Sequence, residues 1–136
     1  MFLSFLMDDI NEDDLKVLEH AVVYFYVDWS VYAMQGLRMF EQLESSWPEP
    51  GSPVAFRLAD VSDVNAPAAF MFEWLKRRER PDQRLCSPIA VGNGSVMWLI
   101  RGDIVDFEPN VTQHDVSVLT ARTKNAFHLR ETQKRK

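Results

Sequence analysis

The chain has 136 residues, and 46% of them are hydrophobic, which is enough apolar material for one folded domain and excludes a disordered composition. Its net charge of −5 argues against general nucleic-acid binding, which usually leaves a basic footprint. The apolar runs are too short and interrupted to span a bilayer, and the N-terminal "MFLSFLM" lacks the basic region of a secretory signal. We therefore expect a cytoplasmic protein that binds neither membrane nor nucleic acid.

Cysteine and histidine content limits the chemistry further. Cys86 is the only cysteine, so the chain cannot form an internal disulfide. His20, His114 and His128 are scattered, without the spacing of metal ligands. We therefore predict neither a metal site nor a bound cofactor.

The N-terminal part of the chain predicts two strands, each followed by a helix. "MFLSFLM" is interpreted as a first strand or packing segment, and Leu15 and Leu18 lie at helical spacing in the acidic stretch that follows. Residues 21–27, "AVVYFYV", form a continuous apolar run, which is typical of a central strand covered on both faces. Steps of three and four residues then predict an amphipathic helix from residue 31 to about residue 47. Its predicted apolar face consists of Met34, Leu37, Phe40, Leu43 and Trp47.

A second central strand is predicted after the loop "PEPGSP", in "VAFRLADV", with Asp60 near its end. A helix follows to about residue 78, capped by Asn65 or Asp63. Its inner face is predicted to hold Phe70, Trp74 and Met71. The basic end of this helix, "KRRER", is interpreted as favourable placement of cations at a helix C-terminus rather than as an anion-binding patch.

The rest of the chain predicts a connector, a hairpin and a last helix. "RERPDQRLCSPIAVGNGS" is interpreted as a mixed connector, and "VMWLI", "RGD" and "IVDF" predict a strand, a tight turn and a strand. The last helix is capped by Thr112 or Asp115. Its predicted inner face holds Val116, Leu119 and Phe127. Residues 1–128 then form a single domain, and we expect the basic residues 129–136 to be a flexible tail.

This order of elements resembles the thioredoxin fold. Alternating strands and helices favour parallel pairing through right-handed crossovers, and the hairpin adds antiparallel strands. "AVVYFYVDWSVYAMQGLRMFEQLE" resembles the family's strand, Trp-Cys-x-x-Cys motif and long helix. "FRLADVSDVNAPAA" resembles its second central strand, and "VMWLIRGDIVDF" resembles its edge hairpin. The resemblance implies an α/β three-layer sandwich, in which helices flank a mixed sheet of four or five strands.

The redox centre of that family is absent from the matching positions. Trp29 matches the tryptophan before the family's cysteines, while Ser30 and Ala33 stand where the nucleophilic and resolving cysteines would be. Thiol–disulfide exchange needs a thiolate and a second thiol, and neither side chain supplies one. Tyr24 matches the family's buried aspartate and cannot accept a proton near neutral pH. The resemblance therefore implies a thioredoxin-like protein without the cysteine pair, which argues against thiol–disulfide catalysis.

The family's cis-proline has two possible counterparts. Pro88 is the nearest proline, whereas counting back from the "RGD" turn places Ser95 at this position. We favour Ser95, because the register of Pro88 needs several extra residues before the hairpin. A cis bond without proline costs about 2.5–4 kcal/mol, so we expect a trans bond, helped by Gly92 and Gly94.

The resemblance also implies a binding surface, because the family's tryptophan and the loop facing it contact substrates. The candidate groove consists of Trp29, Ser30, Tyr32, Ala33, Gly94 and Ser95. Trp29 and Tyr32 are its best candidates for exposure, whereas Met34 and Trp98 are assigned to the core. Ser30 could be a nucleophile at a helix N-terminus, but no histidine lies nearby in the sequence, so we interpret it as a helix cap.

We predict a non-catalytic adaptor or chaperone-like protein that binds a peptide or protein partner through this groove. One alternative is a monothiol redox protein that uses Cys86 with an external thiol, although a partly buried, inert cysteine is the commoner case. Another alternative is a structural component whose edge strand pairs with a second copy of the chain. A pull-down, an insulin-reduction assay with Cys86→Ser and a sedimentation experiment separate the three.

Overall fold

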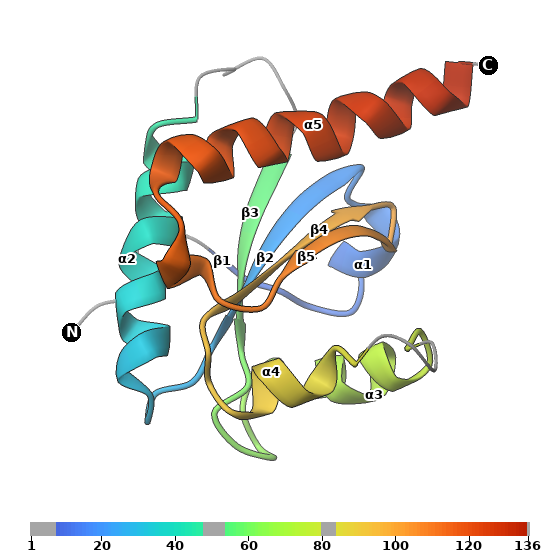
Figure 1. Ribbon diagram of the computed structural model, residues 1–136. Coiled ribbons are helices and arrows are strands. Elements are labelled where there is room, and N and C mark those ends of the chain that lie inside the picture. The colour runs from blue at the N-terminus through green and yellow to red at the C-terminus, as the bar shows by residue number, and fades with distance from the viewer. Residues whose placement is uncertain (1–7, 48–53, 80–83, 136) are drawn as a thin grey trace.

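The computed structural model describes residues 8–47, 54–79 and 84–135, with side chains described as far as Phe127. Its centre is a five-stranded mixed sheet in the order β1-β3-β2-β4-β5 (Figure 1). The strands are β1 (Asp8–Asp9), β2 (His20–Tyr26), β3 (Val54–Asp60), β4 (Ser95–Ile100) and β5 (Asp103–Glu108). The predicted first strand lies mostly outside the described residues, and β1, which follows it, pairs in parallel with β3.

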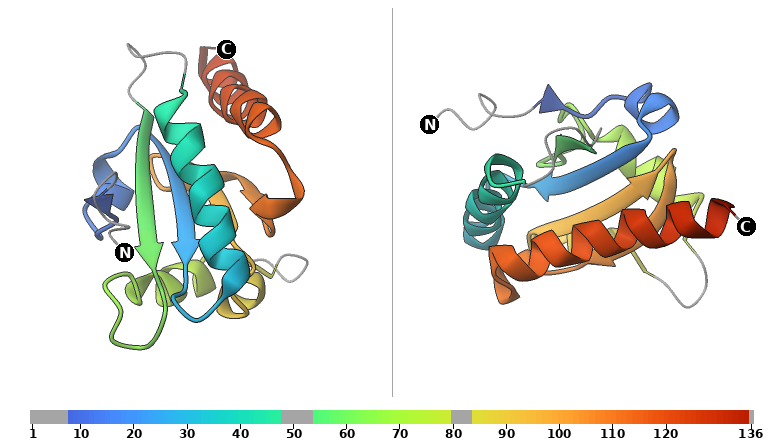
Figure 2. Two further views of the ribbon diagram at one scale, coloured as in Figure 1. Left: turned by 90° about the vertical axis from the view of Figure 1, so that its left-hand side faces the viewer. Right: turned by 90° about the horizontal axis from the view of Figure 1, so that it is seen from above.

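Helices cover both faces of the sheet and complete three layers, as Figure 1 and Figure 2 show. One face carries α2 (Val31–Ser45) and α5 (Val116–Arg135), which follows the short 3₁₀ helix η2 (Val111–Gln113). The other face carries α1 (Asp14–Val17), α3 (Phe70–Lys76) and α4 (Cys86–Ala90). The predicted thioredoxin-like α/β sandwich is confirmed.

β2 is the middle strand, and each of its residues is buried. It pairs in parallel with β3 and antiparallel with β4, so that Tyr24 lies opposite Leu58 on one side and Val96 on the other. Helices on both faces explain why the whole run "AVVYFYV" is apolar. The prediction of a covered central strand is confirmed.

α2 packs on the sheet through Leu37, Phe40 and Leu43, as predicted, but its first turns differ from the prediction. Its buried residues are Ala33, Gly36, Leu37, Phe40 and Leu43. Met34 is 42% exposed, so its assignment to the core is wrong, whereas Trp98 is fully buried as predicted. Ala33 and Gly36 take the inward positions of the first turns, and Met34 is rotated about 100° around the helix axis from Ala33, away from the sheet. The pattern of large apolar residues concealed this, because the inward residues here are small.

α3 begins later than predicted. Asp63 accepts a hydrogen bond from the N–H of Asn65 at 2.8 Å within a turn, and neither residue caps the helix, which starts at Phe70. Pro67 explains the delay, since proline has no N–H and disfavours helical conformation in the residue before it. The buried face holds Met71 and Leu75, while Phe70 and Trp74 are only partly buried.

α4 lies in the segment that the sequence predicted as a connector. Glu79 follows α3, and its Oε1 accepts from the N–H groups of Leu85 and Cys86, at 2.6 and 2.9 Å. This side chain therefore caps the start of α4. Pro88 is tolerated in the first turn because the N–H it lacks has no partner within the helix there. The helix is absent from the prediction because its cap is not adjacent in the sequence.

β4 and β5 form the predicted hairpin. Arg101 and Gly102 make the turn, both with positive φ, as two-residue hairpin turns require. The pairing shifts register between Trp98 and Leu99, which places a β-bulge in the edge strand β5.

α5 begins at the predicted cap Asp115, whose Oδ1 accepts from an N–H of the first turn at 3.0 Å, whereas Thr112 lies in η2. The helix packs on the sheet through Leu119, Thr123 and Phe127. Its backbone stays helical through Arg135, beyond the domain boundary that we set at residue 128. Within the described ranges, no helix has the length and apolar character to cross a membrane.

Candidate functional site

Three loops meet at the end of the sheet where the chain leaves β2, leaves β3 and enters β4, at the bottom of Figure 1 and of the left view in Figure 2. They comprise residues 27–30, 61–69 and 91–94. The first loop leads into α2, so the N-terminus of that helix lies at the same place. The predicted groove residues belong to this end of the molecule.

Ser30 is buried and caps α2. Its Oγ accepts from the N–H of Ala33 at 3.2 Å and donates to the carbonyl oxygen of Gly92 at 2.6 Å. The hydroxyl therefore joins the helix to the loop before β4. Because its proton is already donated to a carbonyl, this hydroxyl is not poised to attack a substrate. The predicted role as a helix cap is confirmed.

Tyr24 fills the space below Ala33. It is fully buried, its hydroxyl donates to the carbonyl oxygen of Ala33, and its ring stacks on Phe40 with centroids 5.4 Å apart. Burial raises the pKa of Tyr24 far above its usual value, and the neighbouring Tyr26 adds to the rise. The phenol stays protonated wherever proteins are folded, so it acts as a donor and not as a base.

The glycine loop, residues 91–94, packs directly against the start of α2. A Cβ added at Gly92 would lie 2.8 Å from the Cβ of Ser30, and one at Gly94 would lie 3.2 Å from the carbonyl oxygen of Tyr32. Both glycines have positive φ, +72° and +79°, which side chains disfavour. The loop reaches Ser30 and Tyr32 this closely because it carries no side chains at these two points.

Ser95 is the first residue of β4, and all peptide bonds of the described residues are trans. Pro88 lies within α4 instead, so the structure agrees with the register that favours Ser95. Ser95 is buried, and its Oγ donates to the carbonyl oxygen of Pro109 at 3.0 Å. Three of the predicted groove residues, Ser30, Ala33 and Ser95, therefore bury their side chains.

Exposed apolar side chains surround these buried groups. Trp29 and Tyr32 are 58% and 60% exposed, and the Nε1 of Trp29 donates to the carbonyl oxygen of Ser62 at 3.2 Å. Val64 and Val91 are exposed in the loops after β3 and before β4. We call Trp29, Tyr32, Val64 and Val91 the aromatic surface. Exposed apolar side chains gathered at one end of a fold are typical of interaction sites.

Cys86 lies apart from the aromatic surface, at the start of α4. It is partly buried, and its Sγ lies 3.8 Å from the carbonyl oxygen of Phe72. Burial raises the pKa of the Cys86 thiol, and the carboxylate of Glu79 raises it further. A raised pKa lowers the thiolate fraction at neutral pH, unlike the electropositive surroundings of reactive cysteines.

A polar cluster between α5 and β5 was not predicted. Arg122 donates to both oxygens of Asp106, at 2.6 and 3.0 Å, and to Glu108 at 2.6 Å. The Nε2 of His114 lies 2.8 Å from Glu108. Burial alone would raise the pKa of Glu108, but the N–H of Asn110 and the charge of Arg122 outweigh it and hold that pKa below its usual value. These bonds fasten α5 to the edge of the sheet.

The same cluster supplies hydrogen-bond partners to backbone groups on the open edge of β5. The N–H of Phe107 donates to Asp106 at 2.8 Å, and its carbonyl oxygen accepts from Arg122 at 3.0 Å. Backbone groups that are bonded to side chains are not available to an added strand. Together with the bulge, this makes that part of β5 a poor template for pairing with another chain.

Comparison with known proteins supports the fold. No protein-family model matches the chain, and no curated protein matches it. The reduced desulfothioredoxin of Desulfovibrio vulgaris Hildenborough is 12% identical with a TM-score of 0.56, and the match covers 85% of this chain and 92% of that chain. A mutant thioredoxin of Halobacterium salinarum is 13% identical with a TM-score of 0.53 and 89% coverage of both chains. A putative oxidoreductase with a thioredoxin fold is 8% identical, with a TM-score of 0.57 and coverage of 91% and 98%.

Identities this low establish the architecture and nothing about activity. The chain has the thioredoxin fold, and Cys86 is its single cysteine, so it lacks the pair of that family. In the described part of the chain, no group of three or more His, Cys, Asp or Glu side chains is arranged to hold a metal ion.

Proposed function

We propose that this chain is a cytoplasmic, non-catalytic thioredoxin-fold protein that binds a segment of another protein, as an adaptor or chaperone does. The binding site is the aromatic surface. The observation that carries the proposal is a difference in burial between neighbouring residues at the start of α2. Trp29 and Tyr32 are more than half exposed, while Ser30 between them is buried with its hydroxyl engaged. This end of the sheet offers contact area and lacks a reacting group.

The fixed position of the aromatic surface supports the proposal. The hydrogen bond from Trp29 to Ser62 and the one from Ser30 to Gly92 join all three loops. These bonds hold together the part of the chain that carries the two exposed rings. Tryptophan and tyrosine contribute much of the energy of protein interfaces, and rings that are already ordered lose little entropy on binding. An extended segment laid across the loops buries both rings at once.

The test is selection of binders from a random peptide library, followed by calorimetry of the recovered peptides. Trp29→Ala and Tyr32→Ala should each weaken binding about tenfold or more, the range of interface hot spots. Val118→Ala is the matched control, because Val118 is 45% exposed on α5 and should leave affinity unchanged. Peptides that bind equally well to the wild type and to Trp29→Ala contradict the proposed site.

The monothiol alternative has its own assay. Insulin reduction in the presence of glutathione is compared between the wild type and Cys86→Ser, and activity that disappears in the variant would support this alternative. The raised pKa of the thiol predicts slow alkylation by iodoacetamide at neutral pH, with a rate that keeps rising above the usual pKa of 9.0. For the oligomeric alternative, the bonded edge of β5 at Phe107 favours a monomer in sedimentation experiments.

A further inference from the structure

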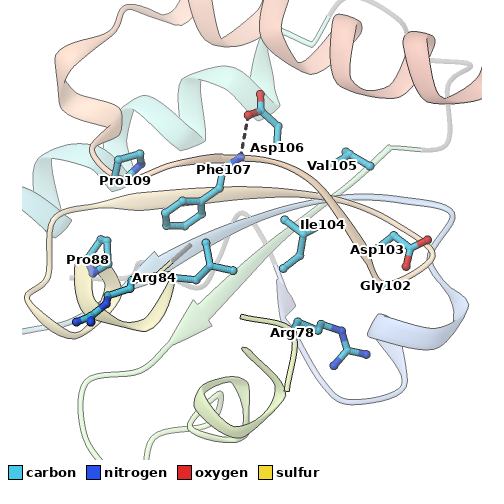
Figure 3. A pocket seen from close by; sticks show the side chains of 11 residues that line it. Arg78, Arg84, Pro88, Gly102, Asp103, Ile104, Val105, Asp106, Phe107 and Pro109 are labelled. Atoms are coloured by element: carbon cyan, nitrogen blue, oxygen red, sulfur yellow. Dashed lines mark hydrogen bonds between the residues drawn. The ribbon is translucent and has the colours of Figure 1, made fainter. Parts of the chain in front are cut away.

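A cavity of about 740 Å³ lies along β5 on the side of α3 and α4, away from the loops of the aromatic surface (Figure 3). One wall is the edge strand with the residues beside it, from Gly102 to Pro109. The other wall is made by Arg78 after α3, by Arg84 and Leu85 before α4, and by Pro88. Sites for small organic molecules occupy about 300–1,000 Å³, so the cavity has the size of such a site.

The middle of the cavity is apolar. Ile104 and Phe107 project from β5, and Figure 3 shows the ring of Phe107 directed toward the end at which Pro88 lies. Both β5 side chains are only partly buried, so they keep apolar surface that a ligand could cover. Removing that surface from water favours binding of an apolar group.

The charges differ between the two ends of the cavity. Arg78 lies toward the Asp103 end in Figure 3 and is already engaged, with its guanidinium 4.0 Å from the ring centre of Trp74. Arg84 lies beside Pro88 at the other end, and it makes no hydrogen bond or ion pair with any described residue. The carboxylate whose charge it feels, Glu79, is itself held by two backbone N–H groups. The end at Arg84 is therefore open to an anion.

Asp106, one of the two acids among the described residues that line the cavity, does not oppose an anion. In Figure 3 Asp106 points away from α3 and α4 and toward α5, and both of its oxygens accept from Arg122. The bonds on Phe107 also exclude one type of occupant, since an extended peptide cannot add to β5 where that residue's N–H and carbonyl are taken. A compact ligand fits better than a strand.

We propose that this cavity binds an amphipathic organic anion, with its carboxylate, sulfonate or phosphate group at Arg84 and its apolar body on Ile104 and Phe107. This site is independent of the proposed function at the aromatic surface. It assigns a binding role to Arg84, which lies in the segment that the sequence analysis interpreted as a connector.

Two dyes of the same aromatic skeleton test the proposal, anilinonaphthalene sulfonate and the uncharged phenylnaphthylamine. We expect saturable, one-to-one fluorescence enhancement with the sulfonate on the natively folded protein, checked by near-ultraviolet circular dichroism. Arg84→Gln should weaken the sulfonate about three- to fivefold and leave the uncharged dye unchanged. Ile104→Thr should weaken both dyes. Arg77→Gln is the matched control, since Arg77 is exposed at the end of α3 and does not line the cavity.

Three results would overturn the proposal. The first is no saturable binding to the folded protein. The second is equal weakening by Arg77→Gln and Arg84→Gln, which indicates general attraction between charges. The third is loss of dye in Trp29→Ala together with full binding in Ile104→Thr, which places the dye on the aromatic surface. None of these results bears on peptide binding at the aromatic surface, so the two proposals fail separately.

Discussion

Gly36→Ala is expected to destabilise the protein, although alanine is the better helix former. A Cβ at position 36 would meet the hydroxyl of Tyr24 and lie 2.8 Å from the Cγ1 of Val111. Alanine gains about 0.8–1 kcal/mol in helix propensity, while overpacking a core costs about 1–3 kcal/mol. The free energy of unfolding should therefore fall, by up to about 2 kcal/mol. The gain in propensity is outweighed because a Cβ at this position meets the side chains of Tyr24 and Val111.

A double-mutant cycle with Tyr24→Phe shows whether the tyrosine hydroxyl is the obstacle. Tyr24→Phe alone should cost about 1 kcal/mol, because it removes the bond to the carbonyl of Ala33. In the double variant the alanine methyl gains the space that the hydroxyl leaves. The loss of unfolding free energy in the double variant should therefore be about 1 kcal/mol smaller than the sum of the losses in the two single variants. Effects of Gly36→Ala on the unfolded chain are the same in both backgrounds and cancel.

The assay is urea denaturation followed by tryptophan fluorescence and far-ultraviolet circular dichroism. Tyr26→Phe is the matched control, because Tyr26 lies on the same strand and no atom of it is among the close neighbours of Gly36. Its cycle with Gly36→Ala should be additive within about 0.5 kcal/mol. Additivity of Gly36→Ala with Tyr24→Phe as well would refute the reasoning, since the hydroxyl would then not fill this space.

Three further predictions concern stability. Ser30→Ala should lower the free energy of unfolding by about 1–2 kcal/mol through loss of the helix cap, and an unchanged urea midpoint would contradict that role. Thr123→Val should cost about 1–3 kcal/mol, since it deprives the buried Nε1 of Trp98 of its acceptor at 2.9 Å, while Thr120→Val on the same helix should cost less than about 0.5 kcal/mol. Glu108 has a lowered pKa in the folded state, so its contribution is present above its usual pKa of 4.5 and is lost as the pH falls through the folded value. Thermal melts from pH 7 to pH 3 should therefore show a shallower acid loss in Glu108→Gln than in the wild type, and parallel curves would show that Glu108 carries no such linkage.

Local sequence patterns predicted much of the fold. The run "AVVYFYV" predicted β2 because a strand covered on both faces is largely apolar. The "RGD" turn between two apolar runs predicted the hairpin of β4 and β5. The spacing back from that turn predicted Ser95, rather than Pro88, as the counterpart of the family's cis-proline, and Ser95 is the first residue of β4. Each of these signals lies within the segment that it describes.

The features that sequence reasoning missed depend on partners distant in the chain. α4 is capped by Glu79, which follows another helix, and Arg122 finds Asp106 sixteen residues earlier. Met34 was placed in the core because it is large and apolar, but the small residues Ala33 and Gly36 hold the inward positions in the first turns of α2. Hydropathy patterns register neither long-range side-chain bonds nor the distance between layers.

The cavity beside β5 could not be predicted from sequence patterns either. Its apolar residues belong to a strand and Arg84 to the segment before α4, and no periodic pattern joins them. Trp29 and Tyr32 were recognised in the sequence because they follow a central strand, where a chain must turn at the surface. The aromatic surface could therefore be anticipated, while the cavity required coordinates.

Tyr24 also determines how a dithiol centre could be engineered into this scaffold. Cysteines at positions 30 and 33 alone would have sulfur but no proton acceptor, because the phenol beneath them never ionises in the working range of a thiol. Tyr24→Asp would supply the acceptor but leave a void against Phe40 and an isolated buried carboxylate. A designer would have to replace the lining of that void in the same step as Tyr24→Asp.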